Sequence, residues 1–291
     1  MSVPTPPGSS AHTARQPTAL QGIGRPAARA DGSTFAPAMR LLPADIRSAV
    51  RSLYGVLRSL DDLVDDDHPE AEQRVEAVEQ WAHGQETDTP EASTLAALAQ
   101  RYPLPRGAVI TFCQGMRHDI GRRTIETHCD FMRYCEQAGG SVGIMLAILL
   151  GSVDPRAETK MASLGRAMQW TNILRDIDED LAHSRVYLPR SLVERFGFPT
   201  PGAREALMKD QIPRADALYD EGLEAIPLLV RGRRSMRLAT ILYREILREI
   251  ERNGYGRKPG RVTVPAWRRR MLASRFGLLP TPHPPTRPPD Q

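Results

Sequence analysis

A stretch in the second half of the chain decides the fold: residues 169–180 read QWTNILRDIDED. Its polar residues recur every three or four positions: Gln169, Asn172, Asp176 and Asp180. A helix places side chains at this spacing along one face, because one turn takes 3.6 residues. The rest of the helix surface is mostly apolar from Leu164 onward, which is typical of a helix inside a bundle. The sequence therefore predicts a central helix with a polar row that is costly to bury unless it binds something.

An earlier stretch of the sequence also places carboxylates on one face of a predicted helix: residues 53–65 read LYGVLRSLDDLVD. In a helix Asp61 and Asp65 lie one turn apart, about 6 Å along the axis, and they repel each other. Near the C-terminal end of a helix, the dipole adds to that cost. One such cluster is typical of a solvated acidic face, whereas a matching pair indicates a bound cation, and Mg²⁺ (or Mn²⁺) prefers carboxylate and phosphate oxygens. The predicted metal ligands are Asp61, Asp62, Asp65, Asp176, Glu179 and Asp180.

Both stretches resemble the signature motifs of the squalene and phytoene synthase family, whose members are head-to-head prenyltransferases. The second motif continues through residues 185–189, RVYLP, and residues 134–143, YCEQAGGSVG, resemble the family segment between the motifs. The resemblance spans residues 32–275. It implies an all-α isoprenoid synthase fold in which helices surround a central cavity and the two Asp-rich motifs face each other across it.

The same resemblance implies a reaction and a set of residues. Two allylic prenyl diphosphates are condensed with Mg²⁺ through a cyclopropylcarbinyl diphosphate. The implied catalytic residues are Tyr54, Arg58, Tyr134, Tyr187 and Tyr243, since phenol rings stabilise cations through their faces. The implied diphosphate-binding residues are Thr34, Arg58, Gln169, Asn172, Arg185 and Arg261. Gly32 and Ile125 depart from the family pattern, which has a serine and a tyrosine at these positions.

Substrate length is a finer question. Residues 243–268 look closer to bacterial phytoene synthases, which favours two geranylgeranyl diphosphates, formation of phytoene and no need for NADPH. We also interpret a set of small residues as leaving depth for a longer chain: Gly139, Gly140, Ser141, Gly143, Ala147 and Gly165. One alternative is farnesyl diphosphate, converted to presqualene diphosphate or, with a hydride from NADPH, to squalene. A non-catalytic assembly-factor relative is an alternative of another class, but its aspartate motifs are expected to be eroded.

The composition sets the domain boundaries. We expect one all-α domain over residues 31–276, since 41% of the chain is hydrophobic and helical periodicity continues throughout. Residues 1–30 are rich in Pro, Ala, Ser, Thr and Gly and predict a disordered arm, and residues 277–291 predict a proline-rich tail. The apolar residues 142–153 are too few to span a bilayer and predict a core helix that lines the cavity.

Charge and cysteine content bear on partners and location. The net charge is +4, and without a recognised nucleic-acid module we expect no nucleic-acid partner. Residues 267–272, WRRRML, predict either a solvated helix face or peripheral contact with a membrane. The three cysteines lack metal-ligand spacing, and reduced thiols are usual in the cytoplasm. We therefore expect a cytoplasmic monomer, peripherally membrane-associated at most, whose partners are prenyl diphosphates.

Overall fold

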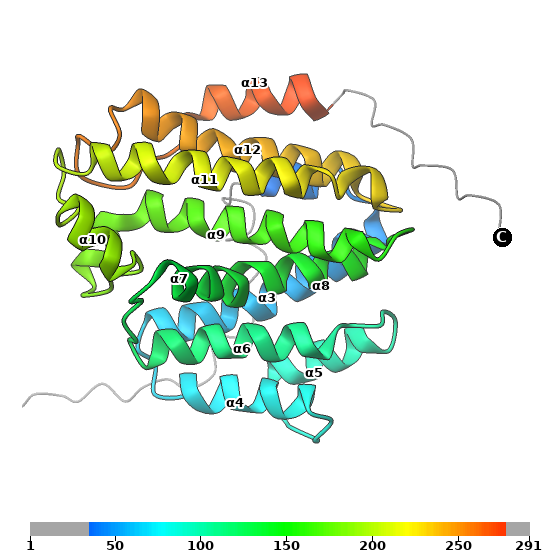
Figure 1. The fold of residues 1–291 in the computed structure, drawn as a ribbon. Coiled ribbons are helices and arrows are strands. Elements are labelled where there is room, and N and C mark those ends of the chain that lie inside the picture. The colour runs from blue at the N-terminus through cyan, green and yellow to red at the C-terminus, as the bar shows by residue number, and fades with distance from the viewer. Residues whose placement is uncertain (1–34, 278–291) are drawn as a thin grey trace, which may run out of the picture.

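The computed structural model describes residues 35–277 and is all-α, as predicted (Figure 1). The predicted arm (residues 1–30), Thr34 and all but the first residue of the predicted tail (277–291) lie outside the described residues. The elements follow in this order: α2 (Ala36–Met39), α3 (Ala44–Asp65), α4 (Ala71–Ala82), α5 (Pro90–Ala99), α6 (Arg106–Ile120), α7 (His128–Cys135), the π-helix η1 (Glu136–Gly140), α8 (Ser141–Leu150), α9 (Arg156–Ala182), α10 (Arg190–Phe196), α11 (Glu205–Leu223), the short 3-10 helix η2 (Ile226–Leu228), α12 (Arg233–Arg252) and α13 (Ala266–Gly277).

Helix starts follow local sequence signals. Pro43, Pro155 and Pro189 directly precede α3, α9 and α10. Proline suits the start of a helix because its φ is already helical and the N–H that it lacks is not needed in the first turn. At α7, Thr127 and Asp130 form a reciprocal capping box, in which each side chain accepts a hydrogen bond from the other residue's backbone N–H. These signals mark where α3, α7, α9 and α10 begin.

The predicted central helix is α9. It lies between α11 and α12 on one side and α7 and α8 on the other (Figure 1). Trp170 is 2% exposed, and the Thr171 hydroxyl bonds the Ala167 carbonyl and the Tyr219 hydroxyl at 2.8 and 2.9 Å. These contacts lock the helix in one rotation about its axis. The polar row predicted from the sequence is thereby directed toward α3.

The backbones of η1 and α8 approach α9 unusually closely. A Cβ added to Gly139 would lie 2.3 Å from the Gly165 carbonyl oxygen, and one on Gly143 would lie 2.0 Å from the Met161 carbonyl oxygen. No side chain fits at such distances, so glycine is required there for helix packing. This corrects our interpretation of the small residues. Gly139, Gly143 and Gly165 do line the cavity, but facing backbone fills the space that their side chains would take.

The remaining three small residues do not deepen the cavity either. A Cβ on Gly140 would meet the Glu136 carboxylate at 2.4 Å. Ser141 and Ala147 are fully buried, and neither is among the residues that line the cavity. The segment 142–153 does contain a cavity-lining core helix, α8, as predicted.

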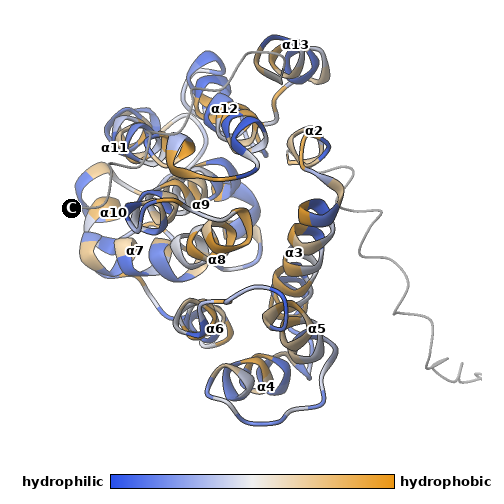
Figure 2. Ribbon diagram, turned by 90° about the vertical axis from the view of Figure 1, so that its right-hand side faces the viewer, coloured by the Kyte–Doolittle hydropathy of each residue, from blue (hydrophilic) through white to orange (hydrophobic). Residues whose placement is uncertain are grey.

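Hydropathy follows the layers of the bundle. Figure 2 shows α8 as strongly apolar within the bundle, whereas α13 is the outermost helix beside α2 and α12 and is largely hydrophilic. The short helix α2 lies between α3 and α12 in this view. No helix within residues 35–277 combines the length and the apolar character needed to cross a membrane.

Candidate active site

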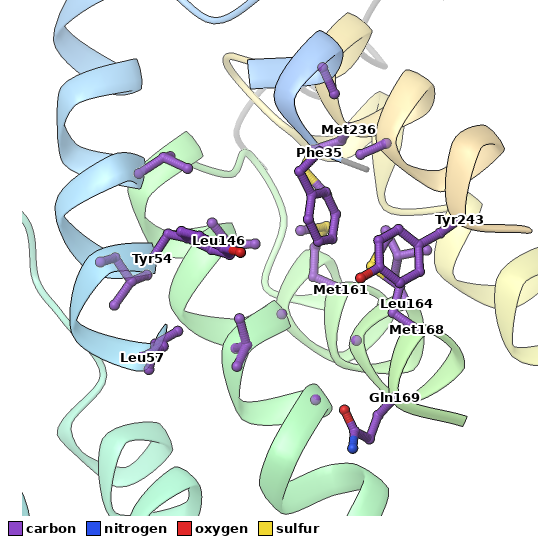
Figure 3. Close-up of a pocket in the computed structure, with 18 of the residues that line it drawn as sticks. Phe35, Tyr54, Leu57, Leu146, Met161, Leu164, Met168, Gln169, Met236 and Tyr243 are labelled. Atoms are coloured by element: carbon purple, nitrogen blue, oxygen red, sulfur yellow. The ribbon is translucent and has the colours of Figure 1, made fainter. Parts of the chain in front are cut away.

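A cavity opens between α3 on one side and α8, α9 and α12 on the other, and α2 contributes one of its walls (Figure 3). Its walls are mostly apolar; they include Phe35, Leu57, Leu146, Met161, Met168 and Met236. Its charged and amide lining comes from α3 and α9, through Arg58, Asp61, Gln169 and Asn172, and α12 adds the hydroxyls of Ser235 and Tyr243. The cavity therefore offers an apolar space with charged and hydrogen-bonding groups on two facing helices.

The carboxylate cluster on α3 is paired mainly within its own helix. Arg58 contacts Asp61 at 2.8 Å and Asp62 at 2.6 Å. Burial in the site, together with the Asp65 carboxylate, raises the pKa of Asp61 to about 7. Arg58 opposes that shift, but it does not outweigh the two effects.

The cluster on α9 is paired both within its own helix and with a residue further along the chain. Asp176 contacts its neighbour Arg175 through two hydrogen bonds and Arg261 at 3.3 Å. Arg261 also contacts Glu179 at 3.2 Å. Burial and the carboxylates of Asp176 and Asp65 raise the pKa of Asp180 to about 7.

The two clusters face each other, as predicted. Arg185, in the loop after α9, pairs with Asp65 at the end of α3. Its guanidinium also donates to the Val64 carbonyl at 3.0 Å, so it caps the C-terminal end of α3. The negative charge of Asp65 contributes to the raised pKa of Asp180. The positive charge of Arg185 partly offsets the rise in pKa at both Asp61 and Asp180. Arg185 thus joins the ends of the two helices.

The donor set fits a hard divalent cation. No three Asp, Glu, His or Cys side chains within residues 35–277 converge closely enough to hold a metal alone. The carboxylates of α3 and α9 are nevertheless crowded, as the raised pKa values of Asp61 and Asp180 indicate. The Asn172 side-chain oxygen is also buried and has no hydrogen-bond partner in the described part of the chain. These oxygens suit Mg²⁺, which usually takes one or two carboxylates together with water and phosphate.

The predicted tyrosines divide into two pairs. Tyr54 and Tyr243 line the cavity, and the Tyr243 ring stacks on Phe35 with centroids 4.6 Å apart. Burial raises the pKa of Tyr54, which keeps its phenol neutral. Tyr134 and Tyr187 stack on each other with centroids 5.1 Å apart, but neither is among the residues that line the cavity.

Sequence reasoning missed Asp119. The Tyr134 hydroxyl donates to its Oδ2 at 3.1 Å, while its Oδ1 is buried and without a partner among residues 35–277. Burial raises the pKa of Asp119 to about 7, although the neighbouring Tyr187 and Tyr134 hydroxyls oppose the shift. The segment Gly115–Asp119 resembles the family pattern, and that was the available signal for this residue.

Sequence reasoning also missed Arg204, which holds the loop before Arg261. Arg204 is 4% exposed and forms two hydrogen bonds, of 2.8 and 2.7 Å, with the Asp178 carboxylate. Asp178 also accepts a hydrogen bond from the Gly260 backbone N–H at 2.7 Å. These contacts fix the position of Arg261 against α9. No sequence spacing signals them, because the partners lie 26 and 82 residues apart.

Comparison with known proteins agrees with this geometry. Residues 28–268 match the squalene/phytoene synthase family. The chain is 36% identical to the phytoene synthase of Thermus thermophilus over 84% of its own length and 88% of that protein. It is 32% identical to the presqualene diphosphate synthase of Rhodopseudomonas palustris over 69% of its own length and 72% of that protein.

Two solved structures have a similar fold. The crystal structure of a dehydrosqualene synthase superposes with a TM-score of 0.77 at 28% identity, over 86% of this chain and 93% of that one. A squalene synthase from Alicyclobacillus acidocaldarius superposes with a TM-score of 0.67 at 26% identity, over 76% of this chain and 89% of that one. The chain is a transferase of the squalene/phytoene synthase family.

Proposed function

We propose that the protein joins two molecules of geranylgeranyl diphosphate head to head and forms phytoene, with Mg²⁺ as its metal. The observation that carries the proposal is the pairing of an apolar cavity with two facing carboxylate clusters. Such a cavity matches a substrate with an anionic head and a long apolar tail. Asp61, Asp62 and Asp65 from α3, with Asp176, Glu179 and Asp180 from α9, would hold the metal.

Arginines beside the clusters act on the leaving diphosphate. Bound Mg²⁺ supplies positive charge that favours departure of diphosphate from an allylic carbon. Arg58, Arg185 and Arg261 each pair with a cluster carboxylate, so they lie within reach of a diphosphate held there. They neutralise the charge that grows on the leaving oxygen as the C–O bond breaks. Gln169 and Asn172 offer hydrogen bonds to the same group from α9.

The apolar walls protect the cations that form. The allylic cation attacks the 2,3 double bond of the second substrate, and loss of a proton from the resulting cation closes a cyclopropylcarbinyl diphosphate. That intermediate releases the second diphosphate, and the new cation rearranges. Water must be excluded during these steps, and the walls of α8 and α12 do so. The faces of Tyr54 and Tyr243 stabilise positive charge inside the cavity. Proton loss ends the sequence, so no hydride donor is consumed.

The choice of a C20 substrate rests on relatives and on wall residues. The chain resembles several phytoene synthases, including those of Thermus thermophilus and Arthrospira platensis. Gly139, Gly143 and Gly165 do not deepen the cavity, because backbone packs against them. Ala38, Ala138 and Ala239 also line the cavity and have small side chains. The presqualene diphosphate synthase relative favours the second candidate, in which two farnesyl diphosphates give presqualene diphosphate.

Separate incubations with each substrate test the assignment. Purified protein is given geranylgeranyl or farnesyl diphosphate, with and without NADPH, and organic extracts are analysed by chromatography and mass spectrometry. We expect phytoene from geranylgeranyl diphosphate without NADPH and slower turnover of farnesyl diphosphate. A C30 product together with no C40 product contradicts the chain length and keeps the family chemistry. No product from either substrate supports a non-catalytic relative.

A further inference from the structure

Helix α13 has an inner face that packs on the bundle. Leu272 is buried in a cluster with α2 and α12, and Phe276 packs partly buried against the same cluster. Arg268 is also on this side, where its guanidinium contacts Glu245 and Glu249 of α12 at 3.2 Å each. These contacts fix the rotation of α13 and so determine which residues it presents outward.

The outer face of α13 combines large apolar side chains with cations. Trp267 is 59% exposed and Met271 is 46% exposed, and they lie one helical turn apart. Arg270 and Arg275 are exposed beside them, and neither pairs with a carboxylate in the described part of the chain. A helix face with Trp, Met and Arg together is typical of a helix that lies in a membrane interface.

Helix α13 is locally basic. The sequence has 39 Lys and Arg against 35 Asp and Glu, a net charge of +4. Helix α13 contains four Arg and no Asp or Glu, so the remainder of the chain is neutral overall. Arg268 is paired with Glu245 and Glu249 of α12, so the positive charge that α13 presents outward includes Arg270 and Arg275, which complement an anionic surface.

Helix α13 also lies one layer from the cavity. It packs on α2 and α12 (Figure 2). Ala38 of α2 belongs to the same cluster as Leu272, and Ala38 also lines the cavity. A surface bound to α13 would thus lie beside the wall that α2 contributes.

We propose that the outer face of α13 docks on anionic lipid bilayers, with Trp267 and Met271 at the level of the headgroups and Arg270 and Arg275 against lipid phosphates. Docking brings the cavity wall next to a phase that dissolves hydrocarbon. The benefit of docking rests on the proposed function, because the product of that function does not dissolve in water. The docking surface itself does not depend on the proposed function.

Tryptophan fluorescence tests the docking directly. Of the three tryptophans, Trp81 and Trp170 are 7% and 2% exposed, and only Trp267 is largely exposed at 59%. Full-length protein is titrated with vesicles of phosphatidylcholine, either alone or with about 30% phosphatidylglycerol. We expect a blue shift of the emission with the anionic vesicles, which is lost in Trp267→Phe because the two remaining tryptophans are already buried.

Co-flotation with the same vesicles measures the two parts of the surface separately. The pair Arg270→Glu and Arg275→Glu should weaken binding at least twentyfold, since each arginine near an anionic surface contributes about fivefold. The pair Trp267→Ala and Met271→Ala should weaken it about tenfold or more. The matched control is Arg51→Glu with Arg101→Glu, which makes the same change of net charge at exposed positions on α3 and beyond α5 and should bind like the wild type. All these side chains are exposed, so melting temperatures should stay similar.

Three results would overturn the proposal. One is equal binding to vesicles with and without phosphatidylglycerol. Another is equal loss of binding in the control pair and in the α13 pairs. The third is a Trp267 shift that depends on protein concentration without vesicles, which would indicate a second copy of the chain as the occupant. Vesicle binding needs no substrate and prenyl transfer is assayed in detergent, so failure of docking and failure of the proposed function are distinguishable.

Discussion

The carboxylate clusters on α3 and α9 lie on facing helices at one site, but they are supported in different ways. On α3, Arg58 contacts Asp61 and Asp62 three and four residues away on the same helix. On α9, Asp176 and Glu179 are contacted by Arg261, which lies 82 residues beyond Glu179. Each cluster also has a partner of the other kind, since Arg175 contacts Asp176 from α9 itself and Arg185 contacts Asp65 from 120 residues away. The α9 cluster differs in that one distant residue, Arg261, contacts two of its carboxylates.

The buried pair behind the α9 cluster makes the contrast sharper. Arg204 and Asp178 hold the loop that carries Arg261 through Gly260. The long-range pair at the α3 cluster, Arg185 with Asp65, is more exposed: its side chains are 11% and 48% exposed, against 4% and 17% for Arg204 and Asp178. We therefore expect loss of the buried pair behind the α9 cluster to cost more stability than loss of the Arg58 contacts on α3.

The largest expected effect comes from removing one charge from either cluster. Asp61→Asn, Asp65→Asn, Asp176→Asn and Asp180→Asn should each lower turnover a hundredfold or more, because lost charge stabilisation of this kind costs about 3–4 kcal/mol. Steady-state turnover of geranylgeranyl diphosphate is the measurement, with melting temperature as a check on folding. The exposed Asp66→Asn is the control on α3 and should be near normal. Near-normal turnover in any two cluster variants contradicts the proposed site.

The next effect separates the two kinds of support. Arg204→Met leaves the Asp178 carboxylate without its partner, and breaking a buried pair in this way costs about 3–5 kcal/mol of stability. Arg58→Met breaks contacts that are about half exposed, so it should cost about 0–1 kcal/mol. Urea denaturation of both variants measures the difference. Equal losses would mean that both clusters are supported alike.

A smaller effect should appear in the pH dependence of stability. Asp119 has a pKa of about 7 in the folded protein against an ordinary value of 3.8. The folded state therefore binds this proton more tightly, and the resulting stabilisation is lost as pH rises through about 7. Between about pH 5.5 and about pH 8 the loss should reach about 2 kcal/mol.

Asp119→Asn isolates that contribution from the other carboxylates. The variant keeps an uncharged side chain at every pH, so the stability difference between wild type and variant should change over this range in the direction given. Urea denaturation at a series of pH values measures the difference. A difference that is constant with pH, or that changes in favour of the wild type at high pH, contradicts the assigned ionisation.

These contrasts also explain what the sequence predicts and what it does not. Helix spacing reports which side chains share a face, so the rows on α3 and α9 and the all-α fold were predictable. Helix spacing does not show which residues a helix face contacts in the folded protein. The spacing of Tyr134 and Tyr187 does not show that their rings stack beside Asp119. Gly139 and Gly165 were interpreted as leaving space, although they are points of backbone contact. Arg204 and Asp178 meet only after the chain has folded.

The central claim is that the facing clusters of α3 and α9 form one metal-dependent prenyl diphosphate site. The most direct measurement is C40 product formation from geranylgeranyl diphosphate in excess EDTA, followed by addition of Mg²⁺ or Mn²⁺. We predict no product with the chelator and full recovery with either metal, without NADPH, because the site consists of hard oxygen ligands. Substantial prenyl transfer in EDTA would contradict the account.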